Sequence, residues 1–480
     1  MFSSTDKSHK ENSKIFYHND LDIHIDLRRM GDYPVINTLN ILERMEKLEA
    51  GDIANYDENR RVGHYWLRNP KLYAKEESQE ILKSWDVLQE VLQNPICKDA
   101  TNLLMIGIGG SALGPQFLVD ALQQVQSNKR VYFLDNTDPD GIDRILQNID
   151  LEQSIFAVLS KSGSTKETRN AMLETISFCE VHNISFAHKA IAVTVKDSKL
   201  DKKAQEDGWL GSLPLWNWVG GRTSATGMVG LLPLAFLGLD WKEFLEGASL
   251  MDAWTRSKDE RENPALHLAS SWLIATEGSG KRAMVVLPYK DRLLLLGRYL
   301  QQLIMESLGK KYNLAGDAVH QGLTVYGNKG STDQHAYIQQ LREGPDDFFV
   351  TFVATLEQRV GKSIEVEEGV TSGDYLLGFL IGTRNALSEE NRRSMTLILP
   401  KVDEKRMGAI IALYERAVGM YAEMIGINAY HQPGVEAGKK AAGIALDLQR
   451  RILAGTATDE DLSSDDGELI KLSLQRNGRL

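Results

Sequence analysis

Short apolar runs rich in branched residues recur along most of the chain, and turn residues and a helical stretch follow most of them. One series lies at residues 103–108, 130–134, 155–160 and 190–195, and a second at 283–287, 323–326, 348–353 and 395–399. Strands that alternate with helices are typical of parallel sheets whose connections are helical. The two series therefore predict an α/β fold with two consecutive, mainly parallel sheets flanked by helices.

Helical patterns occupy much of the remaining sequence. Apolar residues repeat with helical spacing near 36–48 and 76–92, and longer helical patterns run over 291–308 and 404–425. We predict three parts. Residues 1–95 form a helical N-terminal segment that packs on the second domain. Residues 96–255 form a first α/β domain, and residues 256–480 form a second α/β domain with C-terminal helices. The acidic stretch at 459–468 predicts a solvated segment or a helix cap.

The charge balance of the 480 residues is acidic, with 55 Lys and Arg against 66 Asp and Glu and a formal charge of −11. This balance argues against broad binding to nucleic acid or to anionic membranes. The longest apolar stretch, 227–239, is shorter than the ~20 residues of a membrane helix. Cys97 and Cys179 are too few for a disulfide framework, and residues 1–14 lack the apolar core of a signal peptide. We therefore expect a cytoplasmic protein with reduced thiols.

A glycine-rich turn follows the first strand of the first series. Residues 107–112 read GIGGSA and fit the dinucleotide-binding pattern G-x-G-x-x-G/A, while Asp135 follows the next strand. The same turn suits any phosphate, because free N–H groups and the dipole of the following helix attract an anion. These residues alone leave open a nucleotide site, a phosphate site and a plain tight turn.

Hydroxyl side chains gather at a second turn, where residues 160–165 read SKSGST directly before a helical stretch. An N-cap needs a single hydroxyl, whereas several neutral donors beside one cation match a compact dianion. The segment does not fit the G-x-x-x-x-G-K-[ST] pattern of a P-loop. We expect residues 160–165 to bind a monophosphate.

Arginine and glutamate mark two further candidate positions, each with a structural alternative. Arg222 follows two glycines, Gly220 and Gly221, and is either a buried ion-pair partner or a fixed cation that faces a substrate. Glu306 shares a helix face with Gln302 among apolar neighbours, so it is either a base or one member of an ordinary exposed pair.

A histidine and a lysine are the last candidates. His335 lies just inside an expected helix N-terminus with Ser331 or Thr332 as the cap, and the helix dipole there would favour a neutral imidazole. Lys439 stands one turn beyond Val435, in a helix that begins after a Pro-Gly turn. Spacing alone does not separate either residue from a structural or solvated side chain.

Two segments together resemble the signature regions of the glucose-6-phosphate isomerase family, also called the phosphoglucose isomerase family. Residues 220–224 read GGRTS, and residues 430–439 match the pattern [FY]-[DNTH]-Q-x-[GA]-V-E-x-x-K at every specified position. Blocks similar to those of the family occur in the same order at 107–115, 160–168, 305–307 and 334–335. The resemblance spans about residues 60–450. Thr223 departs from the usual aromatic residue, which puts the local packing around Arg222 in question.

The resemblance implies a reaction and a fold. The reaction is the reversible isomerisation of glucose 6-phosphate to fructose 6-phosphate through a cis-enediol or enediolate, in glycolysis and gluconeogenesis. The fold is a pair of doubly wound sugar-isomerase (SIS-type) domains. The resemblance further implies no cofactor, no metal, and a homodimer in which His335 reaches the active site of the partner subunit.

The resemblance also assigns roles to single residues. Glu306 matches the base that moves a proton between C2 and C1, Arg222 the cation that stabilises the enediolate, and His335 the group that opens the sugar ring. Lys439 matches a residue near the ring oxygen. The implied substrate- and phosphate-binding positions are Gly110, Ser111, Ser160, Lys161, Ser162, Thr165, Gly221, Gln302 and Gln432.

Three other functions remain as alternatives. An NAD-dependent oxidoreductase would use 107–112 and Asp135, but it would leave 160–168 and 430–439 unexplained. A non-catalytic sugar-phosphate sensor of the same fold would need the phosphate-binding turn without the acid–base residues. An isomerase that also accepts mannose 6-phosphate is not distinguished from the first interpretation by the sequence.

Overall fold

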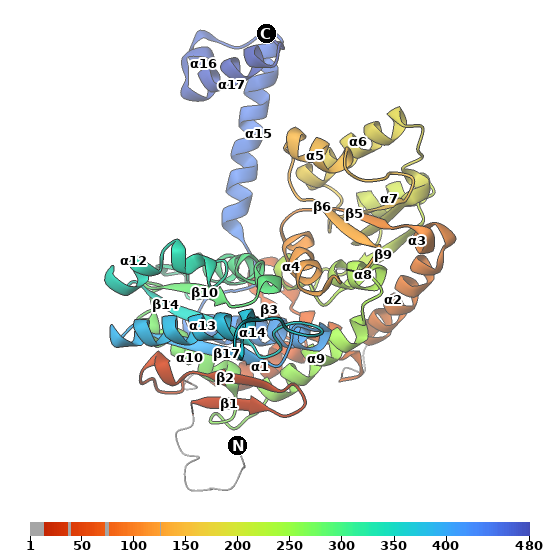
Figure 1. Ribbon diagram of the computed structural model, residues 1–480. Helices are drawn as coiled ribbons and strands as arrows, with labels where there is room; N and C mark the ends of the chain where they lie inside the picture. The colour runs from red at the N-terminus through yellow and green to blue at the C-terminus, as the bar shows by residue number, and fades with distance from the viewer. Residues whose placement is uncertain (1–13, 37–39, 73–75, 125) are drawn as a thin grey trace, which may run out of the picture. The chain divides into compact units, whose positions relative to one another are not determined.

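Helices cover both faces of two separate sheets in the computed structural model, which describes residues 14–36, 40–72, 76–124 and 126–480 (Figure 1). Contacts between residues divide the chain into two units, Met1–Tyr430 and His431–Leu480. Both sheets belong to the first unit. This arrangement confirms the predicted α/β class with two mainly parallel sheets flanked by helices.

The first sheet contains five parallel strands in the order β6-β5-β7-β8-β9. Their bounds are β5 Asn102–Ile106, β6 Arg130–Leu134, β7 Ser154–Leu159, β8 Ala190–Val195 and β9 Gly211–Leu215. The first four agree with the predicted runs to within two residues. The sequence did not predict β9, because Gly211 and Pro214 both disfavour a strand interior. The strand lies at the edge of the sheet, where a proline is tolerated.

Alternate residues of these strands face two different layers of helices. Leu104 and Ile106 pack with residues of α5, α6 and α7, whereas Leu103 and Met105 pack with residues of α2, α4 and α8. The helices are α2 Glu76–Gln93, α3 Pro95–Asp99, α4 Leu113–Leu122, α5 Pro139–Leu146, α6 Lys166–Val181, α7 Lys199–Glu206 and α8 Met228–Phe236. The sheet is buried on both faces, as parallel sheets are.

The second sheet has the order β1-β2-β17-β14-β10-β13. Its strands are β1 Ile15–His18, β2 Ile23–Asp26, β10 Ala283–Pro288, β13 Val325–Tyr326, β14 Phe348–Thr355 and β17 Ser394–Leu399. The last four are parallel to one another, and β2 pairs with β17 in the antiparallel sense. Short pairs of strands lie outside the two main sheets: β3 Ile53–Asn55 with β4 Arg60–Arg61, β11 Lys310–Tyr312 with β12 Ala318–Gln321, and β15 Glu365–Glu367 with β16 Val370–Thr371.

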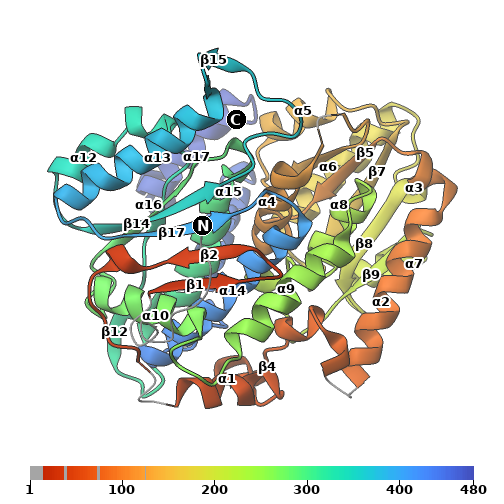
Figure 2. The ribbon, with the colours of Figure 1, turned by 60° about the horizontal axis from the view of Figure 1, so that its bottom comes forward.

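The prediction that residues 1–95 are mostly helical is wrong in part, because β1 and β2 form a hairpin that extends the second sheet (Figure 2). Each strand has only four residues, too few for the alternation of buried Ile23 and Ile25 to stand out in the sequence. The helices α1 Ile41–Glu49 and α2 do match the predicted runs at 36–48 and 76–92, although residues 37–39 lie outside the described part.

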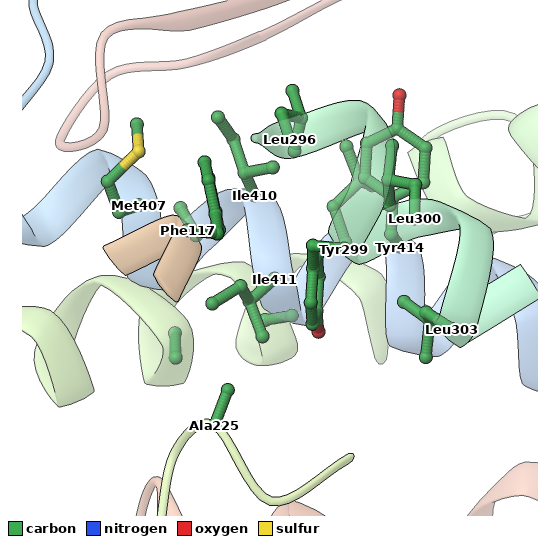
Figure 3. Close-up of a cluster of buried hydrophobic side chains, with 14 of the residues drawn as sticks. Phe117, Ala225, Leu296, Tyr299, Leu300, Leu303, Met407, Ile410, Ile411 and Tyr414 are labelled. Atoms are coloured by element: carbon green, nitrogen blue, oxygen red, sulfur yellow. The ribbon is translucent and has the colours of Figure 1, made fainter. Parts of the chain in front are cut away.

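Helices on one face of the second sheet share their core with the first sheet. Residues of α9 Trp241–Thr255, α10 Pro264–Ala275 and α14 Glu404–Met424 belong to the same hydrophobic cluster as α4 and α8. Figure 3 shows part of it, where the rings of Phe117 and Tyr299 stack with centroids 5.7 Å apart, near Ile410 and Tyr414. The other face packs on α12 Ile338–Glu343 and α13 Ser372–Glu389. The domain limits at 95 and 255 remain predictions.

The second unit consists of α15 Pro433–Leu453, α16 Asp459–Ser463 and α17 Asp465–Arg476. Leu448 and Ile452 of α15 pack against Leu474 of α17. The acidic stretch predicted as a cap or a solvated segment begins α16, where Thr458 and Asp461 form a capping box. Within the described residues, no helix is long and apolar enough to cross a membrane.

A network of buried ions lies in the shared core. Asp252 is fully buried and accepts from Arg68 at 2.8 Å and from Arg416 at 3.2 Å. Arg68 also pairs with Glu415, and Arg416 pairs with Glu49 at 2.7 Å. Although burial alone would raise the pKa of Glu49, Arg416 and its other neighbours lower it to about 2. Each charge is therefore compensated inside the protein, and removing one leaves a partner unpaired.

We expect Asp252→Asn to lower the free energy of unfolding by about 3–5 kcal/mol, because Arg68 and Arg416 would then be buried cations with too little negative charge. Urea denaturation of the two proteins measures the loss. Glu46→Gln is the matched control, since Glu46 pairs with Lys258 on the surface, with side chains 59% and 77% exposed. The control should cost less than about 1 kcal/mol. Equal losses in the two variants would contradict the buried-network interpretation.

Candidate active site

The glycine-rich turn after β5 lies against the turn that carries Arg222. Residues Gly109–Ser111 form η6, and a side chain at Gly110 would place its Cβ 2.1 Å from the carbonyl oxygen of Gly221. The Ser224 hydroxyl bonds to both turns, to the carbonyl of Gly221 at 2.7 Å and of Gly110 at 3.4 Å. The glycine motif at 107–112 thus permits a close approach of two backbones, which is a packing reason for its presence.

The hydroxyl side chains of the turn at 160–165 do not cap α6. Thr165 is the N-cap residue, yet its side chain makes no capping hydrogen bond. Ser160 accepts from the Gly163 N–H at 3.1 Å and donates to Thr165 at 3.3 Å, and the hydroxyls of Ser162 and Ser164 lie 2.7 Å apart. These hydroxyls therefore cluster at the N-terminus of a 16-residue helix, a position that favours an anion.

Lys161 ties this turn to the segment before η8 (Gly221–Thr223). Its ammonium donates to the carbonyls of Asn217 at 2.9 Å and Val219 at 3.1 Å. Burial lowers the pKa of Lys161 to about 8, and the nearby charge of Arg60 acts in the same direction. In this structure the cation thus bridges two turns, and its predicted contact with a phosphate remains a prediction.

Arg222 and Glu306 meet directly, with Arg222 Nη1 and Glu306 Oε2 3.2 Å apart. Arg222 also donates through Nη2 to the carbonyl of Ala429 at 2.6 Å, and its side chain is only 5% exposed. Burial lowers the pKa of Arg222, while Glu306 opposes the shift. The neighbouring Thr223 is buried and bonds to the Gly220 carbonyl at 3.3 Å, so a small hydroxyl residue fits at the position that departs from the family pattern.

Glu306 and Gln302 lie on a π-helix. The predicted helix over 291–308 is wrong as a single α-helix: it divides into η9 Asp291–Leu293, α11 Leu296–Leu300 and the π-helix η10 Gln301–Glu306. Single π-helical turns are rare and are frequently found at functional sites. The Gln302 amide nitrogen lies beside the turn after β5, 3.3 Å from where a Cβ on Gly109 would be. The Glu306 side chain is 25% exposed, so it can reach a bound molecule.

His335 lies on a different element from Arg222 and Glu306. It is exposed and ends the one-turn helix η11 Thr332–His335, so its expected position at a helix N-terminus is wrong. Ser331 is the N-cap residue of this helix, one of the two caps expected, but its side chain makes no capping hydrogen bond.

Two predicted site residues belong to the second unit. Gln432 is the N-cap residue of α15, which begins at Pro433, so Pro433 and Gly434 lie in the first turn of the helix and not in a turn before it as predicted. Lys439 follows on the same helix. Their proposed contacts with substrate remain predictions.

Arg60 adjoins the site without any signal in the sequence. It donates to the carbonyls of Asn217 at 2.8 Å and Tyr430 at 3.1 Å, and it lines a small cavity with Arg222 and Thr223. A single arginine in the two-residue strand β4 matches no motif and no periodicity, so only the fold places it here. In the described part of the chain, no group of three or more His, Cys, Asp or Glu side chains could hold a metal ion.

Comparison with known proteins gives one consistent family. The family model "Phosphoglucose isomerase" matches residues 32–465. Glucose-6-phosphate isomerase from Geotalea daltonii is 55% identical over 86% of this chain and 80% of its own length, and that from Nostoc punctiforme is 51% identical over 92% and 87%. The crystal structure of a glucose-6-phosphate isomerase from Chlamydia trachomatis has a TM-score of 0.84 at 25% identity, covering 98% of this chain and 94% of that one.

Gly110→Ala tests the contact between the two turns. We expect it to destabilise the protein by about 1–3 kcal/mol, because the added Cβ would collide with the Gly221 carbonyl and push the turns apart. Gly378→Ala is the control, since Gly378 lies in α13 with no atom within 4 Å of the added Cβ. There alanine should stabilise the helix by about 0.5–1 kcal/mol. Thermal unfolding separates the two outcomes, and a neutral Gly110→Ala would contradict the close approach.

Proposed function

The chain belongs to the phosphoglucose isomerase family, and we propose that Glu306 and Arg222 carry out its reaction, the reversible isomerisation of glucose 6-phosphate to fructose 6-phosphate. The chain is accordingly an aldose–ketose isomerase of glycolysis and gluconeogenesis. The observation that carries the assignment of residues is the 3.2 Å contact between a partly exposed carboxylate and a buried guanidinium. It pairs a group that can move a proton with a fixed cation.

The chemistry of the reaction explains why these two groups suffice at the reacting carbons. The proton on C2 of the open-chain aldose is weakly acidic, because it is next to the C1 carbonyl. Glu306 takes this proton and returns it to C1, negative charge develops on the oxygens of the enediolate in between, and the hydroxyl proton on O2 passes to O1. Arg222 stabilises that charge without a proton of its own to lose, since a guanidinium stays ionised. Each positioned group of this kind contributes about 10²–10⁴-fold in rate.

The hydroxyl-rich turn is the proposed phosphate site. Ser160, Ser162 and Thr165 supply hydroxyl donors, and the N-terminus of α6 supplies free N–H groups. Lys161 adds a cation at the same turn, which links it to the backbone before Arg222. Anchoring the phosphate there sets the sugar at a fixed distance from Glu306. The further positions proposed to contact the substrate are Gly110, Ser111, Gly221, Gln302 and Gln432.

Ring opening requires an acid–base group in addition to Glu306, because most of the substrate is cyclic. His335 is the proposed group, with Lys439 near the ring oxygen. The exposure of His335 favours action in a neighbouring subunit. We therefore propose a homodimer whose active site combines Glu306 of one subunit with His335 of the other. The proposed location is the cytoplasm, in line with the two buried free cysteines.

Glu306→Gln tests the base. The amide keeps the size of the side chain but cannot accept the proton, so kcat for fructose 6-phosphate should fall by at least about 10². The assay is interconversion of the two sugar phosphates in EDTA, beside binding of fructose 6-phosphate by calorimetry. Lys311→Met, at an exposed position five residues away, should keep full activity. A wild type that binds sugar phosphate without converting it would support the sensor instead, and an undiminished Glu306→Gln would refute this base.

Mixed dimers test the shared site. Glu306→Gln and His335→Ala subunits should each form weakly active homodimers. In a heterodimer of the two, one of the two sites would combine an intact Glu306 with an intact His335. Random reassociation makes half of the dimers heterodimers, so the mixture should recover about a quarter of the wild-type activity. The measurement is activity after dissociation and reassociation of equal amounts of the variants. If the mixture stays as slow as its components, His335 does not act across the interface.

A further inference from the structure

A buried lysine lies directly behind the carboxylate-bearing helix. Lys310 is only 4% exposed, although lysine is among the residues least often buried. Its Nζ donates to the carbonyl oxygen of Glu306 at 2.8 Å and to that of Ser307 at 2.7 Å. Nothing in the proposed reaction uses this amine, and no motif in the sequence points to it.

The two carbonyls are those that the end of a helix leaves without partners. The π-helix η10 ends at Glu306, and the last carbonyls of any helix lack an intrahelical donor. A cation at this end also opposes the negative end of the helix dipole. Lys310 therefore fixes the backbone at the residue that carries the catalytic carboxylate. The contact is made through the main chain, so it leaves the carboxylate itself available to Arg222 and the substrate.

Three charged groups surround the amine. Arg222 approaches from η8, Glu306 from η10 and Asp57 from η3 (Tyr56–Glu58). Burial lowers the pKa of Lys310 to about 7, and Arg222 acts in the same direction, while Glu306 and Asp57 oppose the shift. Near neutral pH the group thus changes between an ammonium with three N–H donors and a neutral amine with two. Both forms can bond to the two carbonyls, but the bonds from the charged form are the stronger.

We propose that Lys310 is a positioning residue for the isomerisation, and that it aims Glu306 by holding the carbonyls of Glu306 and Ser307. The inference rests on the proposed role of Glu306 as the base. Misplacing a reacting group by about 1 Å can cost about 10² in rate. The loss of this hold should accordingly slow proton transfer more than it weakens binding of the substrate, which is anchored elsewhere by its phosphate.

The test compares Lys310→Met with Lys310→Arg. The methionine variant keeps an unbranched chain of similar length without donors, and kcat should fall about 10- to 100-fold while KM changes less than about threefold. Arginine restores donors and charge, so it should recover most of the lost kcat. Lys311→Met removes an exposed lysine from the next position of the same strand and should change nothing. Circular dichroism and the thermal midpoint show that each variant is folded.

The pH dependence separates this role from simple support of the fold. The ratio of kcat between wild type and Lys310→Met should fall at least about threefold from pH 6 to pH 8.5, because the wild type loses its charge over this range. The ratio of kcat between Lys310→Arg and Lys310→Met should stay constant over the same pH range. Titration of the substrate phosphate affects all three proteins and cancels in the ratios.

The possible outcomes test different claims. An inactive wild type would refute the proposed function itself. With an active wild type, an unchanged kcat in Lys310→Met, or a loss confined to KM, would refute only the positioning role. A ratio of kcat between wild type and Lys310→Met that does not vary with pH would also refute the positioning role. If Lys310→Met does not fold, the ratio between wild type and Lys310→Arg decides, since it too should fall from pH 6 to pH 8.5.

Discussion

The ion pair between Arg222 and Glu306 depends on one hydrophobic core that two sheets share. Arg222 follows the last strand of the first sheet, whereas Glu306 lies between strands of the second. Side chains of α4, α11 and α14 pack in this shared core, where Phe117 stacks on Tyr299, two residues before the π-helix (Figure 3). Because such cores are close-packed, the distance between guanidinium and carboxylate is set by the packing of both sheets. The buried ions around Asp252 belong to the same interior, where each charge is matched by another.

Positive charge is concentrated at the site of a protein whose net charge is −11. Arg60, Lys161, Arg222 and Lys310 lie around the turns that bring the two backbones together. Burial lowers the pKa of Lys161 to about 8 and that of Lys310 to about 7, and repulsion by Arg60 and by Arg222, respectively, acts in the same direction. A dianionic substrate would relieve this repulsion on binding. The acidic surface and the basic interior are therefore compatible, because a local field decides which ligand is attracted.

The sequence predicted the regular elements well where local patterns are strong. The parallel strands appear as apolar runs, and α14 appears as a long amphipathic pattern, because burial of a whole face constrains every residue in it. The hairpin of β1 and β2 was missed, since four residues give too short an alternation. The π-helix was predicted as ordinary helix, because the same residues suit both and only tertiary packing selects the wider turn. Lys310 and Arg60 matched no motif, because their partners are backbone carbonyls. Every residue has such a carbonyl whatever its type, so the sequence does not identify the partners.

The pairing of β2 with β17 has a consequence for synthesis of the chain. Ile25 lies opposite Leu397, a residue that emerges from the ribosome roughly 370 residues later. At about 5–20 residues per second, the N-terminal hairpin waits on the order of 20–75 s for the strand it pairs with. The five-stranded sheet between residues 102 and 215 can assemble during that interval, because all its strands are already made. The exposed edges of the waiting hairpin are open to unwanted pairing in the meantime. Rapid burial of Ile23 and Ile25 by a nascent helix or a chaperone would shield them until translation reaches β17.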